Sequence, residues 1–223
     1  MIRLSSHFYS LNQLCEKMPD NSAASLQTLL KEFHIWRVKE FPEYATTADV
    51  HVYNHQLEVL SLQKYDERKI KCDEFLSKLT TIGRGKLTNL TDLTNYDLLE
   101  DHLVTFIDGY KWRFHGACNP VCFLENTHIN FKSFLLDATP FVKKDDFSDY
   151  VKRLNCVPIQ VDEQIELMRK AIEMKTSLHR HSVEKVPGQL TEILEMEIEQ
   201  HPFYEPCVKH IDILTGKSTK QKI

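Results

Sequence analysis

The sequence predicts an all-α fold, and three observations support this prediction. Apolar residues recur at three- and four-residue steps, as they do along one face of an amphipathic helix. Glycine is scarce, with 6 residues in 223, whereas β-rich folds need many tight turns and usually contain more. Prolines stand where the apolar stripes end, because proline disfavours helical geometry in the residue before it. We therefore expect an irregular array of roughly six to eight helices of ordinary length.

The first predicted helix follows an N-terminal extension, residues 1–20. Residues 20–22, Asp-Asn-Ser, are types that cap the starts of helices. Pro42 ends this helix. Residues 43–60 show no clear period, and we interpret them as an irregular connection. The apolar stripe of the helix consists of Leu26, Leu29, Leu30, Phe33 and Trp36.

Two further helices are predicted in the next stretch of the chain. One begins at about position 61 or 64 and ends near position 79, before Gly83 and Gly85. The other begins at about position 91 or 94 and continues to about position 115. Their stripes are Cys72, Phe75, Leu76 and Leu79 in the first, and Tyr96, Leu99, Leu103, Phe106 and Tyr110 in the second.

The second half is predicted to contain shorter helices between loops. A loop covers residues 119–130, and a short helix is expected at 131–137. A helix capped by Asp145 or Asp146 should end at Pro158, and a separate helix should follow it. We expect that following helix to bury one face, made of Ile165, Met168 and Ile172.

The C-terminal part completes the predicted domain organisation. One helix is expected at 182–200, with a kink at Pro187 and Gly188. Residues 21–212 then form one helical region, and residues 213–223 form a polar tail that we expect to be disordered.

Composition disfavours several classes of function. The net charge is −4 and the isoelectric point is about 6.3, so the basic surface that nucleic acids require is not expected. No apolar run approaches the ~18 residues of a membrane span, so no membrane partner is expected. The six cysteines are scattered, which is typical of reduced thiols in the cytoplasm rather than of a disulfide framework.

The histidines and cysteines do not form a recognisable metal motif. A zinc peptidase helix carries two histidines four residues apart, with a glutamate after the first acting as the base. His51 and His55 have this spacing, but Val52 stands at the position of the base. Cys118 and Cys122 lack a second pair that would complete a tetrahedral site. We therefore assign no catalytic residue and no metal ligand in this chain.

One loop is a candidate for lining a substrate cleft. Residues 125–130 place several hydrogen-bonding groups between apolar segments, and loops of this kind often carry function. The same asparagines could equally satisfy their own turn. The candidate cleft residues are Glu125, Asn126 and His128.

A series of short motifs resembles the domain of unknown function 885 family. Each motif alone is weak, and their shared order over about residues 25–210 makes the resemblance more specific. The motifs are FPEYAT at 41–46, NYDLL at 95–99, ATPF at 138–141, YVKRL at 150–154, QIELMR at 164–169, VEKVPGQL at 183–190 and PFY at 202–204.

This resemblance implies a fold and a function. Members of the family are similar to helical zinc metallopeptidases and carry a motif of the form H-E-x-x-P-G-H in their second half. No position of this chain matches that motif, so a zinc cofactor is expected only in full-length members. The resemblance implies the N-terminal half of a helical metallopeptidase-like fold. It would wall a cleft for a peptide substrate and would be inactive alone.

An alternative is a stand-alone helical module that binds a protein partner. The sign of this alternative would be a compact monomer with an exposed apolar groove. For the incomplete family member, in contrast, helices without their usual neighbours would expose apolar faces, and self-association through those faces is expected.

Overall fold

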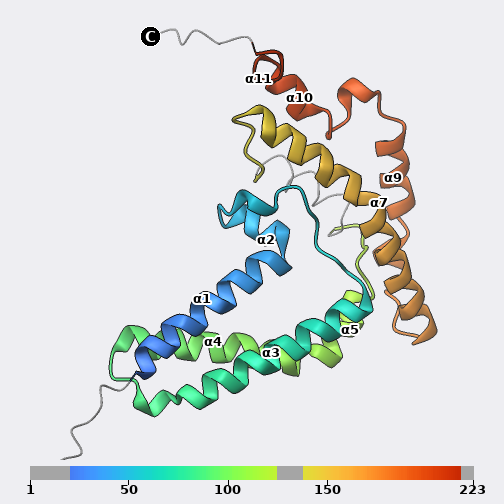
Figure 1. Cartoon of the computed structure of the whole chain (residues 1–223). Coiled ribbons are helices and arrows are strands. Elements are labelled where there is room, and N and C mark those ends of the chain that lie inside the picture. Colours follow the sequence, from blue (N-terminus) through green and yellow to red (C-terminus); the bar gives the residue numbers. More distant parts are fainter. Residues whose placement is uncertain (1–20, 125–137, 217–223) are drawn as a thin grey trace, which may run out of the picture.

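The computed structural model describes residues 21–124 and 138–216, which are helical with loops between the helices (Figure 1). Within these two ranges there is no β-strand, and the predicted all-α class is confirmed. Figure 1 shows two groups of helices. The first group contains α1, α3 and α4, and the second contains α7, α9, α10 and α11.

The first group has a closed core. Three amphipathic helices pack their stripes against one another: α1 (Ser22–Glu40), α3 (Leu62–Ile82) and α4 (Leu90–Asp108). The stripes predicted from the sequence supply this core, so the first two helices are confirmed and the third is confirmed as far as Asp108. Its buried members are Leu26, Leu29, Phe33, Cys72, Phe75, Leu79, Leu87, Tyr96, Leu99 and Leu103.

Local signals set the ends of these helices, although not always as predicted. The backbone at Gly83 adopts φ +77°, a conformation that glycine tolerates best, and its N–H donates to the Leu79 carbonyl. The Asn89 side chain caps α4 by accepting from the Thr91 N–H at 2.8 Å. At the start of α1 the N-cap residue is Asn21, whose side chain accepts no capping hydrogen bond, and Asp20 lies outside the described residues.

Two predictions in this half need correction. Residues 43–60 are not wholly irregular, because they contain α2 (Pro42–Thr47) and the 3-10 turn η2 (His51–Tyr53). Pro42 does end α1, but it also starts α2, since proline is favoured in the first turn of a helix. The helix expected to reach position 115 is interrupted at Gly109, and α5 (Tyr110–Ala117) follows.

The second group is built on α7 (Lys144–Glu173), a single helix of 30 residues. The predicted break at Pro158 is therefore wrong. Pro158 is exposed, and it removes only the one hydrogen bond to the Leu154 carbonyl, which a helix of this length tolerates. At the start of α7 the Asp146 carboxylate accepts from the Val142 and Lys143 N–H groups, at 2.8 and 2.9 Å. Of the two predicted caps, Asp146 therefore acts three residues inside the helix.

The chain beyond α7 turns back along it in short pieces. The predicted helix at 182–200 is divided, because Pro187 begins a new helix instead of kinking an existing one. The predicted domain boundaries stay a prediction, although helical structure continues to Thr215. The pieces are α8 (Arg180–Val183), α9 (Val186–Leu194), η4 (Ile198–Gln200), α10 (Glu205–Lys209) and α11 (Ile211–Thr215).

A second apolar cluster fixes α10 and α11 against the start of α7. Phe141 lies against Phe147 and Tyr150, with ring centroids 5.0 and 5.3 Å apart. The Tyr150 hydroxyl donates to the Phe203 carbonyl at 2.8 Å, and burial raises the pKa of this phenol. Phe203 is thereby held beside α7, at one end of the site described below.

Candidate binding groove

An apolar groove runs between α7 and α9, which lie side by side in Figure 1. Its volume is about 640 Å³, within the range of sites that bind organic ligands. Gln164 is the only polar side chain among the described residues that line it. The lining is Val121, Val157, Val161, Gln164, Ile165, Met168, Val183, Val186, Pro187, Leu190, Ile193, Leu194 and Phe203.

The α7 wall of the groove follows from the helical period of its sequence. Val157, Val161, Ile165 and Met168 recur at three- and four-residue steps and therefore share one face. Leu167 lies on the neighbouring face, where it packs with Cys118 in a small buried cluster. One helix thus presents two adjacent apolar stripes, of which one is buried and one lines the groove.

The predicted burial of Ile165, Met168 and Ile172 is wrong. Ile165 and Met168 are half-buried in the groove wall, and Ile172 is exposed. The side chains buried on this part of α7 are Gln164, Leu167 and Ala171. The apolar period alone could not show which of the two stripes faces the core.

The α9 wall is held in place by the segment that follows α5 in the sequence. The Gln189 side chain donates to the Phe123 carbonyl at 3.1 Å, and the Phe123 N–H donates to the Ser182 carbonyl at 2.9 Å. The Asn119 side chain donates to the Thr176 carbonyl at 2.9 Å, near the turn between α7 and α8. These bonds fix the segment that contributes Val121 to the floor of the groove.

The lip of the groove is apolar and open to solvent. Leu194 is 84% exposed and Ile198 is 71% exposed, although leucine and isoleucine are among the residues most often buried. A second hollow of about 430 Å³ continues from the groove past Leu194 to Tyr204. Apolar surface that is contiguous and rimmed by polar residues is typical of an interaction site.

The rim of the groove carries charge of one sign at one end. Four glutamates in a row of eight residues, Glu192, Glu195, Glu197 and Glu199, are all exposed. Three of them alternate with the apolar lip residues Leu194, Met196 and Ile198. No ion pair in the described part of the chain involves any of the four.

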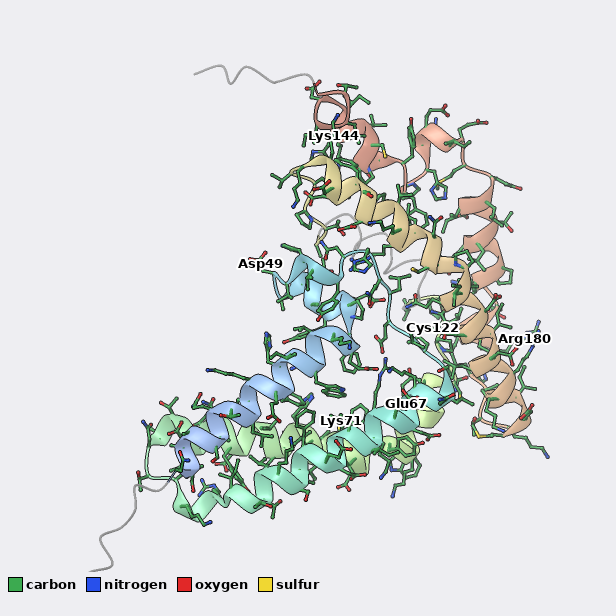
Figure 2. The ribbon with its side chains drawn as sticks, in the orientation of Figure 1. Asp49, Glu67, Lys71, Cys122, Lys144 and Arg180 are labelled. Atoms are coloured by element: carbon green, nitrogen blue, oxygen red, sulfur yellow. The ribbon has the colours of Figure 1, made fainter. Side chains whose placement is uncertain are left out.

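The opposite end of the groove, near the turn between α7 and α8, is charged differently. Arg180 projects outward there in Figure 2 and pairs with Glu184, with 3.7 Å between Nε and Oε2. Glu184 also contacts the His181 ring at 2.8 Å. This end therefore carries the Arg180–Glu184 pair and also Lys185, which lies over the Phe123 ring, whereas the four glutamates without an ion pair lie at the end near Phe203.

The other face of α7 has a structural role that keeps the groove wall in place. It contacts an extended segment, residues 54–61, which joins η2 to α3 and which we call the connector. Arg153, which is fully buried, donates to the carbonyls of Gln56 at 2.8 Å and Tyr53 at 3.1 Å. Gln160 donates to the Glu58 carbonyl at 2.9 Å, and Glu163 accepts from the Leu60 N–H at 2.7 Å.

Charged groups from the first helix group hold the connector from its other side. The buried Arg68 pairs with Glu40 at 2.8 Å and with Glu58 at 2.7 Å. Desolvation raises the pKa of Glu58 to about 7, against the opposing effect of Arg68, and the nearby Glu43 raises it further. Burial likewise lowers the pKa of Arg153 to about 10. These charged side chains satisfy one another's hydrogen-bonding groups and those of the connector backbone. Their role is therefore structural.

The structure offers no place for a catalytic metal among the residues it describes. No three His, Cys, Asp or Glu side chains in those ranges could hold an ion together. The His51 ring pairs with Asp49 at 2.8 Å, and Cys118 is a buried free thiol. The zinc that the resemblance implies for full-length family members thus has no fitting ligand set in the described ranges.

The predicted cleft residues cannot be compared with the groove. Glu125, Asn126 and His128 lie outside the described residues, as does the helix expected at 131–137. The groove itself was missed from the sequence. The available signal was the alternation of apolar and acidic residues from Leu194 to Glu199, which a buried helix would not show.

In the part of the chain that the structure describes, the helices form an all-α fold with an apolar groove open between α7 and α9. Comparison with known proteins adds a family. Residues 42–222 match the model of a family described as bacterial protein of unknown function (DUF885), and the chain belongs to this family. No curated protein and no solved structure matches the chain. Within the described ranges, no helix is long and apolar enough to cross a membrane.

Proposed function

We propose that this chain is a polypeptide-binding member of its family and that the α7–α9 groove receives an apolar segment of another polypeptide. The observation that carries the proposal is the groove itself, with its open lip at Leu194 and Ile198. Covering one such side chain is worth about 1.5–3 kcal/mol. A few such contacts, reduced by the cost of association, correspond to affinities in the micromolar range.

A labelled amphipathic peptide without net charge tests this function, with binding followed by fluorescence anisotropy. Leu190→Glu places a charge in the groove wall and should weaken binding at least tenfold, because the charge must lose its water or exclude the ligand. Leu98→Glu is the matched control, since Leu98 is an exposed leucine on α4. Equal binding by the wild type, the groove variant and the control would overturn the proposal.

The family resemblance suggests a more specific setting for this groove. We propose that it forms part of the wall of a peptide cleft in a metal-dependent peptidase-like protein, and that this chain does not hydrolyse peptides by itself. The support is the missing H-E-x-x-H motif and the lack of a three-ligand group in the described ranges. Purified chain incubated with zinc and peptide substrates should show no turnover. Turnover that a chelator removes would overturn this part of the proposal.

We also propose a cytoplasmic location. The structure describes no disulfide among Cys72, Cys118, Cys122, Cys156 and Cys207, and reduced cysteines are compatible with a reducing compartment.

A further inference from the structure

We propose that the ligand of the groove is an amphipathic α-helix with basic residues beside its apolar stripe. This inference rests on the proposed function, because it names the class of polypeptide that the same groove binds. Two properties of the site carry it, namely the shape of the apolar lining and the charge of the rim.

The shape of the groove matches one helix laid against two. Its walls are helices, and side chains of a third helix can fit between the ridges that such walls form. The lining on α7 extends from Val157 to Met168, which corresponds to about 16 Å or three helical turns. A ligand helix of this length presents apolar residues at positions i, i+3, i+4 and i+7, the spacing by which helices are read in grooves.

The negative charge of the rim favours a positively charged ligand. Glu192, Glu195, Glu197 and Glu199 lie on the chain that forms the lip, and no lysine or arginine lies between them. Two other acids near the groove are paired, Glu184 with Arg180 and Glu205 with Lys209. Lysine or arginine on the ligand would form ion pairs with the four carboxylates, whereas an acidic ligand would be repelled.

The same charges disfavour a second copy of this chain as the occupant. In a symmetric dimer whose two-fold axis passes near this end of the groove, the Glu192–Glu199 segments of both copies would lie together. Such a dimer places like charges opposite one another beside a desolvated groove. We therefore expect this face to bind a different polypeptide, and sedimentation should show a monomer. A dimer that Leu194→Glu dissociates would overturn the inference.

Four labelled peptides separate the inference from the proposed function. They are a basic amphipathic helix, its acidic counterpart, a neutral amphipathic helix, and a scrambled basic peptide without an apolar stripe. We expect the basic helix to bind at least tenfold more tightly than the acidic one, and the difference should shrink when the ionic strength rises from about 0.05 to about 0.2 M. The scrambled peptide should not bind measurably.

Each other outcome is distinct. Equal binding of the three amphipathic helices would overturn the inference and leave the proposed function standing. If none of the three amphipathic helices binds, both the proposed function and this inference are overturned. Both are also overturned if the scrambled peptide binds as tightly as the basic helix, because charge alone would then explain the binding.

Charge reversal on the protein gives the matched control. Glu197→Lys with Glu199→Lys should weaken the basic helix about tenfold and strengthen the acidic one. Asp101→Lys with Asp108→Lys changes the net charge equally on exposed positions of α4, and should alter either affinity by less than about twofold. Equal effects of the two double variants would show that only the overall charge matters and would overturn the inference.

Discussion

The two helix groups of this chain use apolar stripes in opposite ways. In the first group, α1, α3 and α4 each turn a stripe toward the other two, and Leu103 at the centre is fully buried. In the second group, α7 and α9 face each other across an open groove, and Leu194 is 84% exposed. The comparison shows that an apolar period identifies a helix without telling whether its stripe serves the core or a partner.

The largest expected effect is a loss of stability from the closed core. Leu103→Ala removes a fully buried side chain and leaves a cavity among tightly packed neighbours. We expect the free energy of unfolding to fall by about 2–5 kcal/mol. Urea denaturation followed by circular dichroism measures this change. A loss below about 1 kcal/mol would mean that this core is as loosely packed as the groove.

The next largest effect is expected where the two helix groups meet. Arg153→Ala removes hydrogen bonds to the Gln56 and Tyr53 carbonyls and leaves both without this donor. Losing these hydrogen bonds together with the packing of a fully buried side chain should cost about 2–4 kcal/mol of stability.

Hydrogen exchange locates this effect. The amides of the connector, residues 54–61, should lose protection in Arg153→Ala, because α7 no longer holds that segment, whereas those of α4 should change less. Uniform loss of protection in both regions would show that Arg153 supports the whole fold rather than the junction.

A third prediction concerns pH and Glu58. Burial raises the pKa of this carboxyl from its ordinary value of 4.5 to about 7. Between these values the folded protein holds the proton and the unfolded chain does not, so protonation favours the folded state. The contribution of Glu58 to stability is therefore present below about pH 4.5 and is lost as the pH rises through about 7. The loss should be on the order of 1–3 kcal/mol.

Glu58→Gln provides the comparison, because it keeps the shape of the side chain and cannot titrate. The stability difference between wild type and Glu58→Gln should move against the wild type from pH 5 to pH 8. A difference that stays constant would show that Glu58 remains ionised beside Arg68 throughout this range.

The core could be predicted from the sequence where the clearest apolar stripe of a helix is also its buried face. The stripes of α1, α3 and α4 predict the core correctly, because each helix has a single apolar face. The proline signals were less reliable. Pro42 and Pro187 start helices, and Pro158 lies within one, because proline fits the first turn of a helix and, inside a long helix, removes one hydrogen bond without necessarily ending it.

The groove could not be predicted because α7 carries two apolar stripes. Ile165 and Met168 satisfy the same period as the buried Leu167 and Ala171, displaced around the helix. Tertiary contacts choose between the stripes: Arg153 and Gln160 bind the connector and so turn their own face inward. Partners for such buried polar residues lie a hundred positions away in sequence, beyond any local pattern.

The smallest expected effect would sharpen the comparison most. Leu194→Ser exchanges a large apolar side chain for a small polar one at a position that is already 84% exposed. We expect the free energy of unfolding to change by less than about 0.5 kcal/mol, since folding removes almost none of the Leu194 side chain from water. The same substitution should weaken the basic amphipathic helix several-fold, because that side chain is covered only in the complex. If Leu194→Ser instead destabilises the free protein as strongly as a core substitution, the lip contributes to the stability of the fold. The apolar stripes of both helix groups would then serve the fold and not a partner.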